Sequence, residues 1–341
     1  MPGRYHDSWV NRTGPGDARP TAIQIVKDEN RVGTLSDKVV VITGTSGGIG
    51  VETVRAMHLT GATVFATARK ADVLHSVVEE ILKSDPDNKA PIHEIIIDQT
   101  SFASVRKGAQ EILEKSNGKV NILINNAGVM ATPEGKTEDG WETQFGVCHL
   151  SHFLLFQLLK PALLASSTKD FNSRVVNVSS FGHRGGPVRT HDYNFTKDAY
   201  DPWLAYGQAK TANIWMANEI SRLYGSKGLW AYSLHPGGIN SGLGKHLDPA
   251  LFEALNTPTI MAYYKSPAQG AATSVWAAVA HEYEGKPSKW LSNCEEVGPA
   301  EVEGLAFGTV DDGYAPHAFD EAGEKKLWAD SCKAVGVEND S

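Results

Sequence analysis

The stretch VVVITGTSGGIG, from Val39 to Gly50, decides the fold. Its apolar first half predicts a buried strand, and the glycine-rich turn that follows opens a helix. In such a turn, backbone N–H groups and the helix dipole can hold a pyrophosphate. The spacing Gly44-x-x-x-Gly48-x-Gly50 differs from the common G-x-G-x-x-G fingerprint, and a glycine cluster can also be only a tight turn.

The position of this turn favours nucleotide binding. A strand precedes it, a helix follows it, and a second strand comes about 20 residues later. We therefore assign these residues to a cofactor site: Gly44, Ser46, Gly48, Ile49 and Gly50.

Strands and helices alternate along most of the chain. The predicted strands are 39–43, 62–67, a segment ending at Asp98, 121–125, 174–179 and 229–235. The predicted helices follow Gly48, begin at Ala71 and Ser101, span 138–164 and begin again near Trp203. This alternation predicts an α/β fold, a doubly wound parallel sheet of the Rossmann type.

We expect one domain, because no composition break or internal repeat divides the chain. It covers 37–341, with a substrate lid at about 242–266, and an N-terminal arm over 1–36 precedes it. The arm is predicted to be irregular to about residue 20, where Thr21 caps a short helix that runs to Glu29. Trp9 and Tyr5 are expected to pin it to the body.

Composition excludes several classes of partner. The 341 residues are 41% hydrophobic with a net charge of -8, so no basic field attracts nucleic acid or anionic lipid. Cys148, Cys294 and Cys332 are far apart, which argues against a disulfide framework or a zinc site and favours a cytoplasmic location. We find no signal-peptide-like run near the start and no 18-residue apolar stretch, and so expect no membrane anchor.

Arg69 and Lys70 come at the end of the second strand. An enzyme that uses NAD needs a carboxylate there for the ribose 2′-hydroxyl, whereas two cations suit a 2′-phosphate. The pair therefore favours NADP(H), unless it merely begins a solvated helix. Asp98, at the end of the third strand, is placed to accept from the adenine amino group.

Tyr206 and Lys210 lie four residues apart in YGQAK, at the start of an apolar helical run. On one helix face the cation can lower the phenol's pKa and ready it for proton transfer. Tyrosine titrates near ~10, so a shift of about 3 units, roughly 4 kcal/mol, would bring it to neutral. The lysine and a cofactor's positive ring together are expected to supply this shift.

Tyr193 and Lys197 show the same spacing. Tyr193 lies in HDYNFTKDAYDP, a polar segment with the composition of a loop, whereas Tyr206 begins a run of apolar residues at helical spacing. Because a helix is needed to fix the lysine, we choose Tyr206 and interpret Tyr193 as a surface or pocket-edge aromatic.

With these residues assembled, residues 37–335 resemble the short-chain dehydrogenase/reductase family. The motifs occur in order: TGTSGGIG (43–50), Asp98, NNAG (125–128), NVSS (177–180), YGQAK (206–210) and HPGG (235–238). Within the family the chain is similar to retinol dehydrogenases and WW-domain oxidoreductases, through DGWETQFGVCHLSHFLL, DPWLAYGQAKTAN and KKLWADS. We expect no WW module before the domain and no transmembrane N-terminus like that of many retinol dehydrogenases.

The resemblance implies roles for matching residues. Tyr206 would exchange a proton with the substrate oxygen, Lys210 would lower its pKa and hold the nicotinamide ribose, and Ser180 would hydrogen-bond the substrate oxygen. The remaining cofactor-binding residues would be Asn125, Ala127, Gly128, Pro236, Gly238, Ile239 and Ser241. Assembly into dimers or tetramers, through helices 138–164 and 203–224, is expected from the family.

Cys148 departs from the family pattern, which places there an asparagine that supports a water chain to the lysine. A thiol replaces an amide poorly, and we favour a buried packing role for it over a reactive one. Proton resupply would then be slower or use another route, through His149 or His183. His149 and His152 lack a nearby carboxylate, so we predict no metal site. His183 and Arg184 either line the pocket or belong to a turn.

The sequence thus predicts an NADP(H)-dependent oxidoreductase that interconverts an alcohol and a ketone or aldehyde on a small apolar substrate. The candidate pocket walls are Trp141, Phe181, Trp203, Tyr263 and Tyr264. The competing hypothesis is a cofactor-binding scaffold or regulator with weakened turnover. A nucleotide-sugar epimerase uses the same Tyr and Lys but a differently spaced glycine loop, and ranks last.

Overall fold

A single sheet forms the centre of the molecule. The structure is a computed structural model, and it describes residues 3–248, 250, 253, 256–287, 289–305 and 311–341. Within them the sheet has eight strands in the order β3-β2-β1-β4-β5-β6-β7-β8, all parallel except the β7–β8 pair. The strands are β1 (Val39–Ile42), β2 (Thr63–Ala68), β3 (Ile92–Ile96), β4 (Ile122–Asn125), β5 (Ser173–Val178), β6 (Leu229–His235), β7 (Trp290–Ser292) and β8 (Glu295–Glu296).

This topology confirms the predicted doubly wound α/β fold, and all six predicted strands are present. The short strands β7 and β8 were not predicted. The strand order reverses between β1 and β4, and in such sheets ligands bind beyond the carboxyl ends of the strands at that point. The glycine turn follows β1 there.

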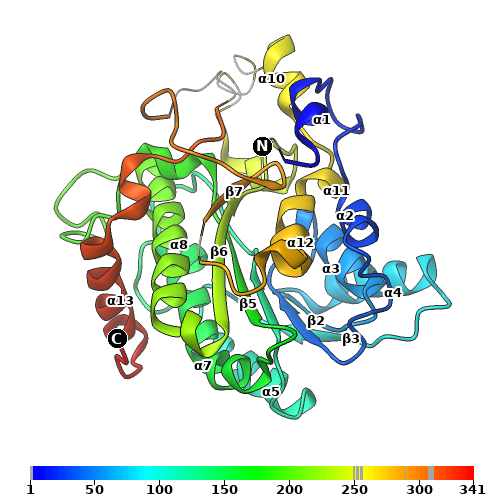
Figure 1. Cartoon of the computed structure of the whole chain (residues 1–341). Coiled ribbons are helices and arrows are strands. Elements are labelled where there is room, and N and C mark those ends of the chain that lie inside the picture. Colours follow the sequence, from blue (N-terminus) through cyan, green and yellow to red (C-terminus); the bar gives the residue numbers. More distant parts are fainter. Residues whose placement is uncertain (1–2, 249, 251–252, 254–255, 288, 306–310) are drawn as a thin grey trace.

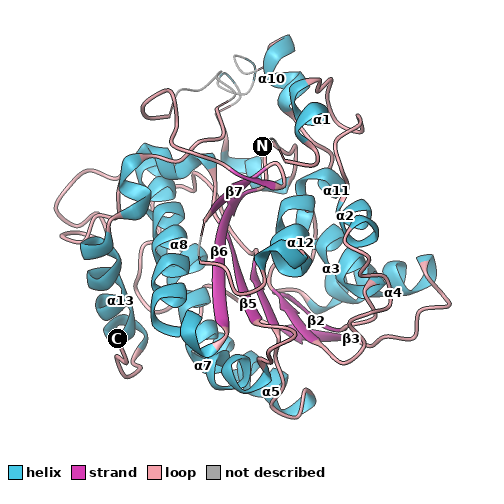
Figure 2. Ribbon diagram, in the orientation of Figure 1, coloured by secondary structure: helices cyan, strands magenta, loops and turns pink. Residues whose placement is uncertain are grey.

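Helices cover both faces of the sheet (Figure 1, Figure 2). They are α1 (His6–Val10), α2 (Ala22–Asp28), α3 (Ile49–Leu59), α4 (Ala71–Ser84), α5 (Phe102–Lys115), α6 (Thr143–Phe145), α7 (Ser151–Ser166), α8 (Pro202–Tyr224), α10 (Pro258–Tyr263), α11 (Pro267–Gly270), α12 (Ala272–Val279) and α13 (Glu321–Val335).

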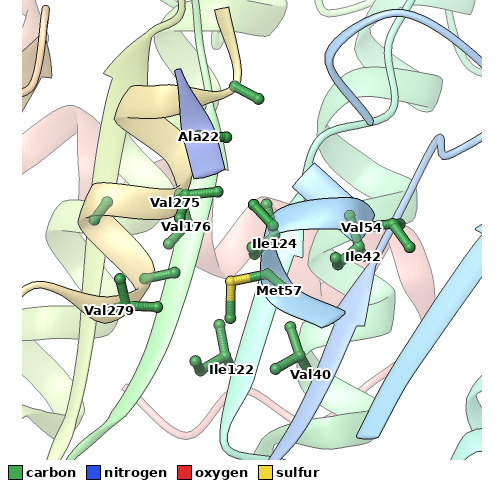
Figure 3. Close-up of a cluster of buried hydrophobic side chains, with 14 of the residues drawn as sticks. Ala22, Val40, Ile42, Val54, Met57, Ile122, Ile124, Val176, Val275 and Val279 are labelled. Atoms are coloured by element: carbon green, nitrogen blue, oxygen red, sulfur yellow. The ribbon is translucent and has the colours of Figure 1, made fainter. Parts of the chain in front are cut away.

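Successive residues of β1 point into two different cores. Val40 and Ile42 pack with α2, α3, α4 and α12, whereas Val39 and Val41 pack with α5, α7, α8 and α13. Figure 3 shows the first core, where sheet residues meet Met57 of α3. Because both faces are buried, the strands are apolar at consecutive positions.

The long helix expected over 138–164 begins later than predicted. The Glu142 carboxylate accepts hydrogen bonds from the backbone N–H groups of Gln144 and Phe145, and this cap starts α6. A π-helical turn, Gly146–Leu150, then leads into α7, which ends at Ser166. Asp201 caps α8 in the same way, so the helix predicted near Trp203 is confirmed.

The window from Thr143 to Ser166 also corrects the expectation that no 18-residue apolar stretch exists. An 18-residue stretch within these 24 residues has a mean hydropathy of 1.4, enough by length and composition to cross a membrane. In the fold, 78% of that 18-residue stretch is buried among other elements. It therefore serves as a core helix.

The N-terminal arm is more ordered than predicted. It contains α1 within the segment expected to be irregular, and Thr21 caps α2 as expected, accepting from the Gln24 N–H at 3.2 Å. Trp9 is buried, and the Tyr5 hydroxyl donates to Asp28 at 2.8 Å. Because α2 contributes to the first core, residue 36 does not mark a change in packing.

Helix α13 lies along α7 and α8 (Figure 1). Its Trp328 ring lies 5.0 Å from the Phe153 ring of α7, centre to centre, and its Glu324 carboxylate accepts from Asn218 of α8 at 2.6 Å. These are the two helices through which the family resemblance predicts assembly. Two copies of the chain could pair through the faces of α7 and α8 that α13 covers only if α13 moved.

Candidate functional site

The glycine turn needs glycine at two positions for steric reasons. Gly44 has a φ of +70°, and a Cβ there would lie 2.6 Å from the Ala127 Cα atom. A Cβ on Gly50 would lie 2.2 Å from the Gly44 carbonyl oxygen. Gly48 precedes α3, and no side chain caps this helix. The first backbone N–H groups of α3 can therefore bind an anion. Ser46, in the preceding turn, is exposed.

Thr43 ties this turn to the NNAG segment. Its hydroxyl oxygen accepts from the backbone N–H of Asn126 at 2.9 Å and of Ala127 at 3.0 Å. It also lies 2.9 Å from the His152 Nε2 atom, while His152 Nδ1 lies 3.0 Å from the Cys148 carbonyl oxygen. Since that carbonyl can only accept, Nδ1 carries the proton and Nε2 accepts from Thr43. Burial lowers the pKa of His152 to about 4, which keeps the ring neutral.

The residues predicted to bind the adenosine end follow β2 and β3. Arg69 and Lys70 are exposed, and neither makes an ion pair with a described residue. The Thr45 N–H donates to the Thr67 carbonyl at 2.9 Å, so the end of β2 adjoins the glycine turn. One oxygen of Asp98 accepts from the Thr100 N–H and hydroxyl at 2.9 and 2.7 Å. The two cations are thus unpaired beside the turn.

The structure brings Ser180, Tyr206 and Lys210 together past the carboxyl end of β5. The Tyr206 hydroxyl makes a hydrogen bond with Ser180, and the Lys210 Nζ atom lies 5.6 Å from the centre of the Tyr206 ring. Lys210 donates to the Val178 carbonyl at 3.1 Å, which fixes its ammonium. Tyr206 and Lys210 are 3% and 4% exposed, so little water reaches them.

Burial dominates the pKa of Tyr206. Desolvation raises it above 10, whereas the Lys210 cation and the Ser180 hydrogen bond lower it by less. In the protein alone the lysine therefore does not bring the pKa of the phenol towards neutral, and its joint effect with a cofactor's positive ring stays a prediction. The phenol is protonated at neutral pH, as a proton donor must be.

The other predicted cofactor residues are divided between the interior and the site. Asn125 is buried, and its amide donates to Asn177 at 2.8 Å. The 236–241 segment faces the glycine turn, because a Cβ on Gly48 would lie 3.6 Å from the Ser241 Cβ atom. Ile239 and Ile49 both contact Gly270. Gly128 lies between Cys148 and Lys210, with 3.5 Å from its Cβ position to the Sγ and Nζ atoms.

Tyr193 is excluded by its partners. Its hydroxyl donates to Asp330 of α13 at 2.6 Å, and its ring stacks on Phe145 at 5.0 Å. The Lys197 ammonium instead donates to the His191 carbonyl at 3.0 Å. The choice of Tyr206 over this pair therefore agrees with the structure.

Cys148 lies in the π-helical turn next to the site, and its thiol contacts the backbone of Val129. Its Sγ atom lies 3.5 Å from both the N–H and the carbonyl oxygen of Val129. Burial raises the pKa of this thiol, so it stays neutral. The structure supports the packing role.

The alternative proton routes stay predictions, and the structure gives both histidines other partners. His149 points to α13, with Nε2 2.9 Å from the Ser331 hydroxyl, and burial lowers its pKa to about 3. His183 accepts at Nε2 from the Ala315 N–H at 3.1 Å and lies 2.7 Å at Nδ1 from the Ser180 carbonyl; its pKa is also lowered to about 3 by burial. Arg184 is buried in the same turn and pairs with Asp311 at 3.3 Å. These residues support the turn after Ser180.

The expected pocket walls differ in how they lie around the site. Trp203 packs edge-on to Tyr206 with 6.2 Å between ring centres, and Phe181 lies beside His235 at 6.5 Å. Trp141 is half-buried and packs against the second core, 6.3 Å from Phe145, and its assignment to the pocket stays a prediction. In the lid, residues 249, 251–252 and 254–255 lie outside those described. Among the described residues, no cluster of three metal-ligating side chains occurs.

Sequence reasoning missed a hydrogen-bonded chain behind the HPGG turn. His235 Nδ1 accepts from the Phe181 N–H at 3.1 Å, and Nε2 lies 2.9 Å from the Tyr263 hydroxyl. That hydroxyl donates to Asp312 at 2.5 Å. Burial lowers the pKa of His235 to about 4, so the neutral ring donates through Nε2. His235 was quoted in the motif, but no local signal pointed to Asp312.

An uncapped helix after a glycine turn, together with a cluster of a serine, a buried tyrosine and a buried lysine, defines a Rossmann-type nucleotide-binding oxidoreductase. Residues 38–251 match the family model described as short chain dehydrogenase. The chain belongs to this family, and the resemblance drawn from its motifs is confirmed.

Known relatives span nearly the whole chain. The short-chain dehydrogenase/reductase prx1 of Penicillium roqueforti is 47% identical, over 98% of this chain and 96% of that protein. Retinol dehydrogenase 13 of Homo sapiens is 33% identical, over 89% of this chain and 86% of that protein. A solved structure of an uncharacterised protein from Mycobacterium paratuberculosis is 28% identical with a TM-score of 0.66, over 95% of this chain and 100% of that one.

Proposed function

We propose that the protein is an NADP(H)-dependent oxidoreductase that interconverts an alcohol and a ketone or aldehyde on a small apolar substrate. The observation that carries the proposal is the cluster of Ser180, Tyr206 and Lys210. A carbonyl oxygen gains negative charge during reduction. The phenol can protonate this oxygen, the second hydroxyl can donate a hydrogen bond to it, and the fixed cation stabilises the charge that forms.

The residues present fit a dinucleotide. The uncapped start of α3 and the glycine turn would hold the pyrophosphate, and Arg69 and Lys70 would hold a 2′-phosphate. A bound nicotinamide would supply or accept the hydride. Lys210 would bind the ribose hydroxyls next to it.

The protein's own residues manage the substrate oxygen. In reduction the Ser180 hydroxyl orients the carbonyl, and Tyr206 donates its proton to the oxygen as the carbon gains the hydride. In oxidation the tyrosinate takes this proton back. Lys210 stabilises the tyrosinate in both directions, because a cation lowers the pKa of a nearby phenol.

The test is oxidation of NADPH and NADH by purified protein against a panel of ketones and aldehydes. We expect turnover with NADPH, and Tyr206→Phe should lower kcat about 100-fold or more, the usual contribution of acid catalysis. Tyr193→Phe is the matched control, because it removes a hydroxyl bonded to α13.

Two outcomes would contradict the proposal. A wild-type protein no faster than Tyr206→Phe on every substrate would favour the cofactor-binding scaffold. An equal loss in Tyr193→Phe would show that the tyrosine at 206 is not the acid.

A further inference from the structure

The N-terminal arm contacts residues 262–265, the segment that packs on the HPGG turn. Arg19 is buried and donates to three backbone carbonyls at the end of α10: Ala262 at 3.2 Å, Tyr263 at 2.9 Å and Tyr264 at 2.6 Å. Its Nε atom pairs with Asp17 at 2.8 Å. A guanidinium has enough donors for all of these bonds, whereas a lysine does not.

The segment that Arg19 holds packs directly on the turn. A Cβ on Gly238 would lie 3.3 Å from the rings of Tyr263 and Tyr264. The Lys265 N–H donates to the Gly238 carbonyl at 2.8 Å. Any shift of residues 262–265 would therefore move Gly238.

Lys265 adds a second link. Its buried ammonium donates to the Pro236 carbonyl at 2.8 Å and to the Asn293 amide oxygen at 3.1 Å. It also lies 4.0 Å from the centre of the Trp9 ring, and no carboxylate pairs with it among the described residues. The face of the Trp9 ring thus takes the place of an anion beside the Lys265 ammonium.

The bonds close into a ring. Lys265 donates to Asn293, whose amide donates to Asp312 at 2.5 Å. Asp312 also accepts from the Tyr263 hydroxyl, which accepts from His235. His235 precedes Pro236, whose carbonyl accepts from Lys265. Lys265, Asn293 and His235 are buried, and Tyr263 and Asp312 are half-buried. Because each member of the ring bonds to two others, the loss of one link disturbs the bonds that hold the turn.

We propose that Trp9 and Arg19 are positioning residues, which hold the His235–Gly238 turn in place through residues 262–265. If the proposed function holds, this turn in its place orients the bound nicotinamide and the substrate; that part of the inference rests on the proposed function. Both residues contact the segment 262–265, and this segment contacts the turn. Their role is therefore more than a contribution to the stability of the fold.

The experiment compares Arg19→Lys and Trp9→Leu with Tyr5→Phe. The control removes a hydrogen bond of the same arm, but one made to Asp28 rather than to residues 262–265. Amide exchange at Lys265 reports on the bond to Gly238 without any turnover. We expect exchange at least 10-fold faster in the two variants and unchanged in the control.

Kinetics give the second readout. We expect kcat/KM for the substrate to fall about 10-fold, with the Kd for NADPH within 3-fold of wild type. If the two variants do not fold, Tyr263→Phe, which breaks the ring but keeps the arm, should show the same pattern. A lower Tm with unchanged exchange and unchanged kcat/KM would overturn the proposal. If wild type shows no turnover, the proposed function fails, while the exchange result still decides the positioning role.

Discussion

Gly182 lies against the ring of Tyr206. A Cβ at this position would be 2.5 Å from the Tyr206 Cε1 atom and 3.4 Å from the Ser180 Oγ atom. Because real Cβ atoms do not approach so closely, glycine is what allows the serine and the tyrosine to meet.

Gly182→Ala should therefore displace Tyr206 from Ser180. We expect kcat to fall at least 10-fold, since a small misplacement of the acid is costly. Gly298→Ala is the control, because nothing lies within 4 Å of its Cβ position. Steady-state kinetics with the best carbonyl substrate measure the effect, and an alanine variant with wild-type kcat would contradict it.

Lys210→Met should change the pH dependence of alcohol oxidation. Oxidation needs the tyrosinate, and the Lys210 cation lowers the pKa of Tyr206, so removing this cation raises that pKa. The rising limb of the kcat profile should move to higher pH by about 1 unit or more. Lys197→Met, which removes an ammonium that donates to the His191 carbonyl, should leave the profile in place. A loss of rate without any shift would argue against this role.

Arg69→Ala and Lys70→Ala should weaken NADPH binding about 10-fold each, because a charged hydrogen bond contributes roughly 1.5 kcal/mol. NADH binding should change by less than about 3-fold, since it has no 2′-phosphate. Fluorescence titration of both cofactors measures this difference. Lys107→Ala, an exposed cation of α5, is the control. Equal losses for the two cofactors would refute the 2′-phosphate assignment.

Cys148→Ala should leave kcat within about 2-fold of wild type at every pH. Burial raises the pKa of this thiol and its partner is the Val129 backbone, so it does not exchange protons near neutral pH. Stability should fall by about 1–2 kcal/mol from the lost packing. Cys332→Ala provides a buried cysteine for comparison. A loss of activity that depends on pH would place Cys148 in the proton route.

His149 should make the fold sensitive to acid. Its pKa is lowered by burial from 6.5 to about 3, so the unfolded state binds the proton more tightly. The stability it contributes is complete above pH 6.5 and is lost progressively as the pH falls to about 3. At pH 5 this loss is about 2 kcal/mol.

Urea unfolding at pH 7.5 and pH 5.0 tests this sign. His149→Gln should reduce the difference in the free energy of unfolding by about 2 kcal/mol. The same change at exposed His191 should not. An undiminished difference in His149→Gln would mean that His149 is already charged in the folded protein.

The sequence by itself determined six strands of the sheet, the glycine turn and the helical context that favours Tyr206 over Tyr193. Each depends on neighbours along the chain: apolar runs make strands, glycines allow the close approach of Gly44 to Ala127, and helical spacing aligns Tyr206 with Lys210. The start of α6 was missed because one carboxylate cap, Glu142, outweighed the periodicity.

Only the tertiary structure decided the rest. Arg19 and Tyr264 are 245 residues apart in the chain, and no local pattern relates them or joins Asp312 to Tyr263. The burial that outweighs Lys210 in setting the pKa of Tyr206 likewise comes from segments folded around it. Local propensity specifies the elements, whereas desolvation and long-range hydrogen bonds exist only once those elements pack together.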